Sequence, residues 1–246
     1  MTDTPAPTIQ DKLEMMGIPR DSYDVKPLSR VQKFIAQRLT DASRDVPSFP
    51  LETEIALDAL LAARAAYNAK GAGKVSVNDL IIKAAGLSLM AVPEVNASFT
   101  TDGIIQHHGA DVAVAVAADS GLITPIVRAA HALSVAEITV KMKDLVARAQ
   151  TRKLNPEEYT GGTFAVSNLG MFGITRFGSI INPPHGAIVS IGAGKERAIA
   201  REGQIVVATM MTATLTCDHR VIDGATGARW LQNFQGQIEA PDALFG

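Results

Sequence analysis

One histidine stands where a folded chain would present a catalytic group. His219 lies in the run Thr-Cys-Asp-His-Arg-Val-Ile-Asp-Gly, at the end of the longest apolar strand that the sequence predicts and just before a predicted helix. Rigid scaffolds present catalytic groups at such strand ends, and an imidazole there can act as a general base. Asp223 and Gly224 follow in the same turn. The alternative is a structural turn in which His219 caps the following helix, and the spacing alone favours neither interpretation.

Two further side chains could act as a nucleophile or a hydrogen-bond donor. Cys217 and His219 would point side by side from a strand, with Cα atoms about 6.6 Å apart. A small buried hydrophobe is therefore favoured over a nucleophile at Cys217. Ser167 ends another predicted strand and enters a glycine-containing loop, where its hydroxyl could donate to a developing oxyanion. Taken alone, Ser167 is better interpreted as an ordinary serine in a turn.

The other histidines give no metal site. His107 and His108 are adjacent and expected to be exposed, but no third ligand lies near them in the sequence. His131 precedes a predicted helix, and His185 lies in a proline-containing loop, where it could line a pocket or be solvated. Metal sites need several His, Cys, Asp or Glu side chains at ligand spacing. No metal is therefore expected.

Composition excludes several classes of protein. The 246 residues carry 23 basic and 25 acidic side chains, a net charge of −2, so no basic excess exists to neutralise nucleic acid. No apolar run reaches the roughly 18 residues of a membrane span, and the N-terminus lacks the order of a secretory signal. A single cysteine suits a reducing compartment. The glycine-bearing stretches 161–173 and 187–194 match no phosphate loop or Rossmann fingerprint. We expect a cytoplasmic protein that binds neither nucleic acid nor membranes.

Helices and strands are predicted to alternate along the chain. Capping boxes and apolar spacing predict helices that begin at Ser29, Ser76 and Ser134, and composition predicts two more, over 58–69 and 225–239. A short helix is predicted over 9–18. Alternating or continuous apolar residues predict strands over 51–55, 111–118, 163–168, 187–191 and 204–216, and a hairpin over 99–107. Apolar side chains on both faces of 111–118 indicate a central, buried strand. A single α/β sandwich with helices on one sheet is the economical fold.

The chain resembles a known family in several blocks. Asp-His-Arg-Val-Ile-Asp-Gly-Ala at 218–225 resembles the active-site signature of the acyltransferase (E2) components of 2-oxoacid dehydrogenase complexes, and its reduced form, His-x-x-x-Asp-Gly, is shared with chloramphenicol acetyltransferases. Further blocks resemble the same catalytic domain in the same order, at 27–39, 75–89, 121–130, 161–174 and 181–194. The resemblance implies a chloramphenicol acetyltransferase-like two-layer sandwich, a mixed sheet with helices packed on it. It places the catalytic domain at 24–246, after a mobile N-terminal arm at 1–23.

The resemblance also implies a reaction. An acetyl group would move between dihydrolipoamide and coenzyme A, with His219 as general base and Ser167 stabilising the oxyanion. Asp223 would belong to the same site and fix the loop that carries His219, through an ion pair with an arginine such as Arg38. Acetyl is favoured because Ser-Asn-Leu-Gly-Met-Phe-Gly at 167–173 resembles the pyruvate-complex branch, whereas succinyl-transferring relatives usually carry Ser-Asn-Gly-Gly. No coenzyme A contact residue is assigned.

The family further implies partners. Its unit is a homotrimer with the active site between subunits, so His219 and Ser167 would come from different chains. A higher cage would use the C-terminal Leu244 and Phe245 as an anchor. No lipoyl or peripheral subunit-binding domain is recognised, so the lipoyl group would come in trans, with E1 and E3 components as further partners. Ser48 stands where relatives often carry histidine.

Two alternatives to this activity stay open from the sequence. An inactive scaffold or E3-binding-type core is disfavoured by the intact His219, Asp223 and Ser167. A stand-alone acyltransferase acting on a free small molecule, as in the chloramphenicol enzymes, is disfavoured by the long match to the E2 blocks.

Overall fold

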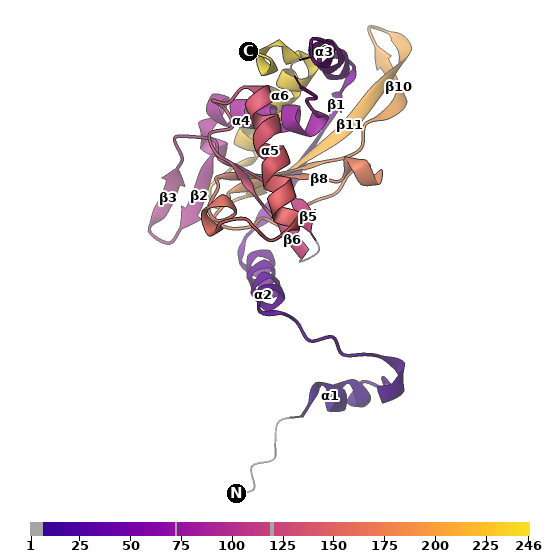
Figure 1. Ribbon diagram of the computed structural model, residues 1–246, viewed down its shortest axis with the longest axis vertical. Helices are drawn as coiled ribbons and strands as arrows, with labels where there is room; N and C mark the ends of the chain where they lie inside the picture. Colours follow the sequence, from indigo (N-terminus) through magenta and orange to yellow (C-terminus); the bar gives the residue numbers. More distant parts are fainter. Residues whose placement is uncertain (1–6, 72, 119–120) are drawn as a thin grey trace, which may run out of the picture. The chain divides into compact units, whose positions relative to one another are not determined.

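The chain divides into two compact units. The computed structural model describes residues 7–71, 73–118 and 121–246 (Figure 1). One unit comprises residues 1–36 and the other residues 37–246, and the boundary falls inside helix α2 (Arg30–Asp45). As predicted, Ser29 forms a capping box at the start of α2, with its hydroxyl accepting from the backbone N of Gln32 at 3.2 Å.

The first unit contains the predicted short helix. Helix α1 (Ile9–Met15) begins at the capping box of Thr8 and is followed by the single turn η1 (Arg20–Ser22). Arg20 pairs with Glu14 at 2.6 Å and with Asp11 at 3.0 Å, which folds this segment back on itself. The mobility expected of residues 1–23 stays a prediction, and residues 1–6 lie outside the described part of the chain.

A mixed sheet forms the centre of the second unit. Its strands lie in the order β1 (Ser48–Ala56), β11 (Gln204–Asp218), β9 (Ala187–Ile191), β8 (Phe164–Asn168), β4 (Val112–Val114) and β7 (Ile126–Val127). Strand β8 is parallel to both of its neighbours, and the other pairs along this order are antiparallel. The first residues of β11 pair instead with β10 (Lys195–Arg201), and the two form a hairpin that projects from the sheet (Figure 1).

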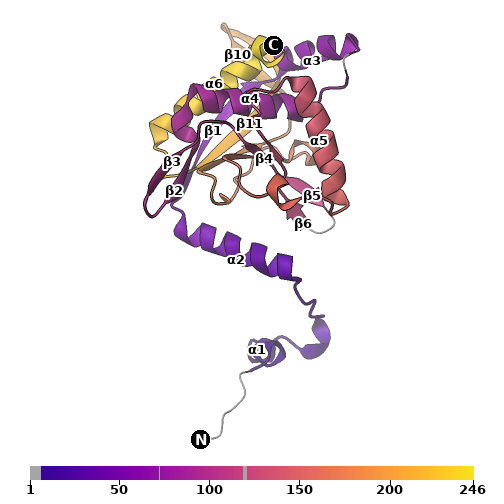
Figure 2. The same ribbon diagram turned by 60° about the vertical axis from the view of Figure 1, so that its left-hand side comes forward.

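Helices cover one face of this sheet. They are α3 (Asp58–Ala69), α4 (Val77–Ala91), α5 (Val135–Gln150) and α6 (Gly224–Glu239), and α4 packs between α5 and α6 (Figure 2). Their apolar sides meet the sheet in one large core, where Trp230 of α6 lies 4.9 Å from Phe164 of β8 between ring centroids. The opposite face carries a smaller cluster that includes Ala42 of α2 and Val46, the residue after this helix. This is the expected two-layer sandwich.

The remaining elements are short. They are the 3-10 turns η2 (Pro93–Val95), η3 (Pro156–Glu158), η4 (Gly170–Phe172) and η5 (Pro241–Leu244), the hairpin β2 (Ala97–Thr100) and β3 (Gly103–Gln106), and the pair β5 (Val116–Ala118) and β6 (Gly121–Ile123). The hairpin turns at the predicted Asp102-Gly103. Among the described residues, no helix is long and apolar enough to cross a lipid bilayer.

Two expectations about these elements are wrong. Residues 111–118 do not form one buried strand, because the chain leaves the central sheet after Val114 and continues as the partly exposed strand β5. A run of small apolar residues shows no difference between the two environments, so the break is not visible in the sequence. The expected cage anchor of Leu244 and Phe245 is contradicted at Leu244, which is only 1% exposed and packs into the core of its own chain, whereas Phe245 is half-buried.

Candidate active site

His219 lies on a tight turn that follows β11. The backbone N–H groups of Val221 and Ile222 both donate to the carbonyl of Asp218, at 3.1 and 2.9 Å. The backbone N of His219 donates to the carbonyl of Pro47 at 3.0 Å. Its imidazole is exposed and lies against the ring of Phe49, with centroids 4.5 Å apart and planes tilted by 43°. The backbone of this histidine is therefore fixed while its ring stays open to a substrate.

The two neighbours of His219 form an ion pair. The carboxylate of Asp218 is 3% exposed as a residue and accepts from Nε and Nη2 of Arg220, at 2.9 and 2.7 Å. This bond is the main cause that raises the pKa of the Arg220 guanidinium. The guanidinium carbon of Arg220 also lies 4.0 Å from the ring centre of Phe99. Asp218 and Arg220 lie within the active-site signature at 218–225, but the sequence alone indicated no role for either.

Asp223 caps the helix that follows the turn. Its carboxylate accepts from the backbone N of Thr226 at 2.7 Å, and this bond lowers the pKa of the exposed Asp223 side chain. Negative charge and a side-chain acceptor at this position stabilise the first turn of a helix. Asp223 therefore fixes where α6 begins, directly after the His219 turn.

Arg38 does not take the role expected of it. Its guanidinium donates to Oδ1 of Asn182 at 2.8 Å and to the carbonyl of Pro183. The loop that follows returns to the His219 turn, because the backbone N of Asp218 donates to the carbonyl of Gly186 at 2.8 Å. The ion pair expected between Arg38 and Asp223 is thus replaced by an indirect connection. Arg38 holds the loop that receives Asp218.

Ser167 lies near the end of β8 and is half-buried. In the sheet register it is opposite Ser190 of β9, which is opposite Thr214 of β11. Directly after it, the side chain of Asn168 accepts from the backbone N of Gly170 at 2.9 Å and donates to Asn78 at 3.1 Å. The glycine-containing loop beside Ser167 is therefore well anchored.

One chain does not bring Ser167 and His219 together. Ser167 shares a row of the sheet with Thr214, two strands away, or about 10 Å. His219 lies five positions beyond Thr214 along the chain, which is about 16 Å in extended conformation. The two residues are therefore roughly 19 Å apart across the sheet, too far to act on one carbonyl carbon. Asp223 belongs with His219.

The remaining candidates have structural roles. Cys217 is fully buried, and burial raises its pKa to about 12, so it is the small hydrophobe that was expected. His185 is not solvated: it is 3% exposed, with Nε2 3.0 Å from the carbonyl of Gly161, and burial lowers its pKa to about 4. His107, expected to be exposed, is half-buried, and burial lowers its pKa. Within the described residues, no group of three His, Cys, Asp or Glu could hold a metal ion.

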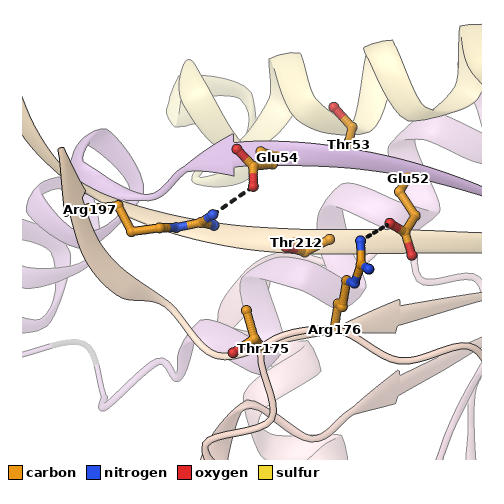
Figure 3. A pocket seen from close by; sticks show the side chains of 7 residues that line it. All are labelled: Glu52, Thr53, Glu54, Thr175, Arg176, Arg197 and Thr212. Carbon is orange, nitrogen blue, oxygen red and sulfur yellow. Dashed lines mark hydrogen bonds and ion pairs between the residues drawn. The ribbon is translucent and has the colours of Figure 1, made fainter. Parts of the chain in front are cut away.

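A hollow in the surface lies beside β1, β10 and β11 (Figure 3). It has a volume of about 320 Å³ and is lined by residues of β1, β10, β11 and the loop before β9: Glu52, Thr53, Glu54, Thr175, Arg176, Arg197 and Thr212. Arg197 pairs with Glu54 at 2.6 Å and Arg176 with Glu52 at 3.1 Å. Both guanidinium groups already have carboxylate partners, so the hollow is a poor receptor for a phosphate.

The fold and the His219 turn define the class of protein. A mixed sheet under one helical layer, with His-x-x-x-Asp-Gly after its longest strand, is the arrangement of acyltransferases with the chloramphenicol acetyltransferase fold. A chloramphenicol acetyltransferase superposes with a TM-score of 0.52 at 17% identity, covering 83% of this chain and 92% of that one, which shows the fold alone. Residues 20–246 match the model of the 2-oxoacid dehydrogenases acyltransferase family (catalytic domain). The chain belongs to this family.

Individual relatives narrow the comparison. The chain is 47% identical over 227 residues to the dihydrolipoyllysine-residue acetyltransferase component of the pyruvate dehydrogenase complex of Rhizobium meliloti, covering 89% of this chain and 51% of that protein. It thus spans about half the length of the curated relatives it matches. The cubic core of a pyruvate dehydrogenase multienzyme complex superposes with a TM-score of 0.88 at 25% identity, covering 98% of this chain and 99% of that one.

One solved relative bears on the site residues. The dihydrolipoamide acetyltransferase of Azotobacter vinelandii also superposes with a TM-score of 0.88 at 25% identity, covering 98% of this chain and 99% of that one. A serine, a histidine and an asparagine were investigated in its catalytic mechanism, and 52 and then 4 positions separate them. The same spacing separates Ser167, His219 and Asp223. The third position carries a carboxylate here and a carboxamide there.

Proposed function

We propose that this chain is the acyltransferase core that moves an acetyl group between dihydrolipoamide and coenzyme A in a pyruvate dehydrogenase-type complex. The observation that carries the proposal is the match in spacing between Ser167, His219 and Asp223 and the residues investigated in the Azotobacter vinelandii enzyme, on the same fold. The 47% identity to a protein named for this activity supports acetyl as the group transferred.

The chemistry follows from the two separated groups. The imidazole of His219 takes the proton from the thiol of coenzyme A, which at an ordinary pKa near 8.5 is mostly protonated at neutral pH. The sulfur attacks the carbonyl carbon of acetyl-dihydrolipoamide, and the hydroxyl of Ser167 donates to the oxyanion that forms. The intermediate then expels the dihydrolipoamide sulfur, which receives the proton from His219. Both substrates meet at one carbon, so no acyl-enzyme is needed.

A homotrimer provides a site that one chain lacks. Because Ser167 and His219 are roughly 19 Å apart in one chain, a neighbouring copy supplies one of the two groups at each site. The surface beside Ser167 suits such a contact, since Met171 and Phe172 follow it and are 86% and 66% exposed. Large exposed apolar side chains that lie together mark interaction surfaces. Assembly of trimers into a cage stays a prediction, and it would have to use contacts other than Leu244, which is buried in its own chain.

The substrates define the partners and the compartment. The lipoyl group arrives on a lipoyl domain, which is acetylated by an E1 component and reoxidised by an E3 component. Coenzyme A is the second substrate, and the cytoplasm supplies it.

The proposal is tested by measuring thioester formation from acetyl-coenzyme A, with free dihydrolipoamide and with a reduced lipoylated domain as acceptors. The chain should acetylate both, and His219→Ala should lower turnover by ~10² or more. The matched control is His108→Ala, because that histidine is exposed. Full turnover of His219→Ala would refute the mechanism. Absence of transfer to either thiol would favour an inactive scaffold, and transfer to chloramphenicol alone would favour a small-molecule acyltransferase.

A further inference from the structure

We propose that Arg220 is a positioning residue for His219, acting through its ion pair with Asp218 and its contact with Phe99. The inference rests on the proposed function only in what it says about turnover. Its structural content, that Arg220 fixes the orientation of the neighbouring imidazole, stands on the contacts of residues 218–220.

The ion pair closes a ring around the backbone of His219. Asp218 and Arg220 flank His219, and the carboxylate of Asp218 binds both the guanidinium and the backbone N of Arg220. The carboxylate of Asp218 accepts from Nε at 2.9 Å, from Nη2 at 2.7 Å and from the backbone N of Arg220 at 3.0 Å. Two parallel bonds between a guanidinium and a carboxylate fix the relative orientation as well as the distance. The backbone on both sides of His219 is therefore held by one rigid unit.

The pair is also attached to the rest of the fold. Asp218 is 3% exposed, and a buried carboxylate needs a bonded cation, so Arg220 is the partner it depends on. The guanidinium of Arg220 lies 4.0 Å from the ring centre of Phe99, on β2, and Nη1 donates to the carbonyl of Asp45 at 3.4 Å. The Asp218–Arg220 ion pair thus connects the end of β11 with a strand of the β2–β3 hairpin and with the end of α2.

The imidazole of His219 has few other means of support. Its ring contacts Phe49, and its backbone N binds Pro47, but no hydrogen bond is formed by either ring nitrogen among the described residues. A ring held from one side depends on the backbone beneath it for its direction. A displacement of about 1 Å in a reacting group can cost ~10²-fold in rate, so loss of the ion pair should reach the reaction through His219.

Three variants separate positioning from folding. Arg220→Met removes the two-point guanidinium–carboxylate bond and leaves the carboxylate of Asp218 buried without its cation, so it can unfold the chain. Asp218→Asn/Arg220→Met removes both charges and keeps the volume, which avoids that penalty. Arg220→Lys keeps the positive charge but replaces the two-point guanidinium with a single ammonium group. The matched control is Arg44→Met, because Arg44 makes the same two-point bond to Asp45, at 2.7 and 2.9 Å, on an exposed surface.

Two readouts decide the outcome. In the acetyl-transfer assay, the double variant should lose 10- to 100-fold in kcat with KM for both substrates within about twofold, Arg220→Lys should recover part of the loss, and Arg44→Met should match the wild type. In NMR spectra of chains with labelled histidine rings, the signal that disappears in His219→Ala should move in the double variant and stay in Arg44→Met. A folded double variant with unchanged kcat overturns the inference while leaving the proposed function intact. If the wild type transfers no acetyl group, the proposed function fails, and an unmoved His219 signal overturns the inference independently.

Discussion

Coexpression of a Ser167→Ala chain with a His219→Ala chain should restore activity that neither chain has alone. Each variant should by itself retain at most about 1% of wild-type turnover, since losing a general base or an oxyanion donor costs roughly 10²-fold or more. In a mixed trimer, a site between two chains is intact when its histidine comes from the Ser167→Ala chain and its serine from the His219→Ala chain.

The recovery has a defined size. With random assembly at equal amounts, about one quarter of the sites receive both intact groups, so the mixture should show about 25% of wild-type activity. This is at least roughly 25-fold above either parent. The distance that requires it comes from the sheet, where Ser167 and His219 are separated by about 10 Å across the strands and about 16 Å along them.

A second mixture checks the same geometry from the other side. Wild-type chains coexpressed with Ser167→Ala/His219→Ala chains should give about one quarter of full activity if each site needs two intact chains, and one half if each chain carries its own site. Chains with different affinity tags and native mass spectrometry would establish the mixing. Activity at the average of the parents in the first mixture, together with one half in the second, would refute a shared site.

Three further predictions concern the support of the site. Burial lowers the pKa of His185 to about 4, below its ordinary 6.5, so on acidification the unfolded chain protonates at this imidazole before the folded chain does. The free energy of unfolding should therefore be unaffected by His185 above about pH 6.5 and should fall by roughly 3 kcal/mol by pH 4. Urea unfolding against pH should show this slope, and His185→Gln should flatten it. Asp223→Ala should lower the melting temperature by about 2–4 °C, whereas Asp223→Asn should be nearly neutral, because both side chains cap helices equally well. Gly186→Ala should destabilise the chain strongly, since the added Cβ would lie 2.3 Å from the carbonyl oxygen of Ala97. In the control Gly236→Ala, the added Cβ meets nothing within 4 Å and should stabilise α6. Coinciding melting curves of the two variants would contradict this packing argument.

Much of the fold could be predicted because its signals are local. Ser76 and Ser134 each exchange bonds with an acidic residue three positions later, and both predicted helices begin there. The alternation in 51–55 and the apolar run in 204–216 gave two neighbouring strands of the sheet. The position of His219, after the end of β11, followed from the length of that run.

Other features could not be predicted because they depend on distant residues. Strand β10 pairs only with the projecting part of β11, and its one large apolar side chain, Ile199, packs on a small cluster, so its sequence carries only a weak periodic signal. The run 112–118 is uniformly apolar although only its first half lies in the central sheet. Arg38 could have paired with any carboxylate near the site, and its choice of Asn182 depends on a loop more than 140 positions away.

The same distinction divides the proposed catalytic residues into two sets. His219 and Asp223 belong to one turn and one helix cap, so four positions of sequence suffice to place them together. Ser167 is placed by the register of β8 with β9 and β11, and that register moves it away from His219 rather than toward it. A stable fold of one chain therefore completes each half of the site and cannot join them. In the proposed trimer, contacts between chains supply the free energy that unites the two halves, so substitutions at an interface beside Met171 and Phe172 should abolish activity without unfolding the chain.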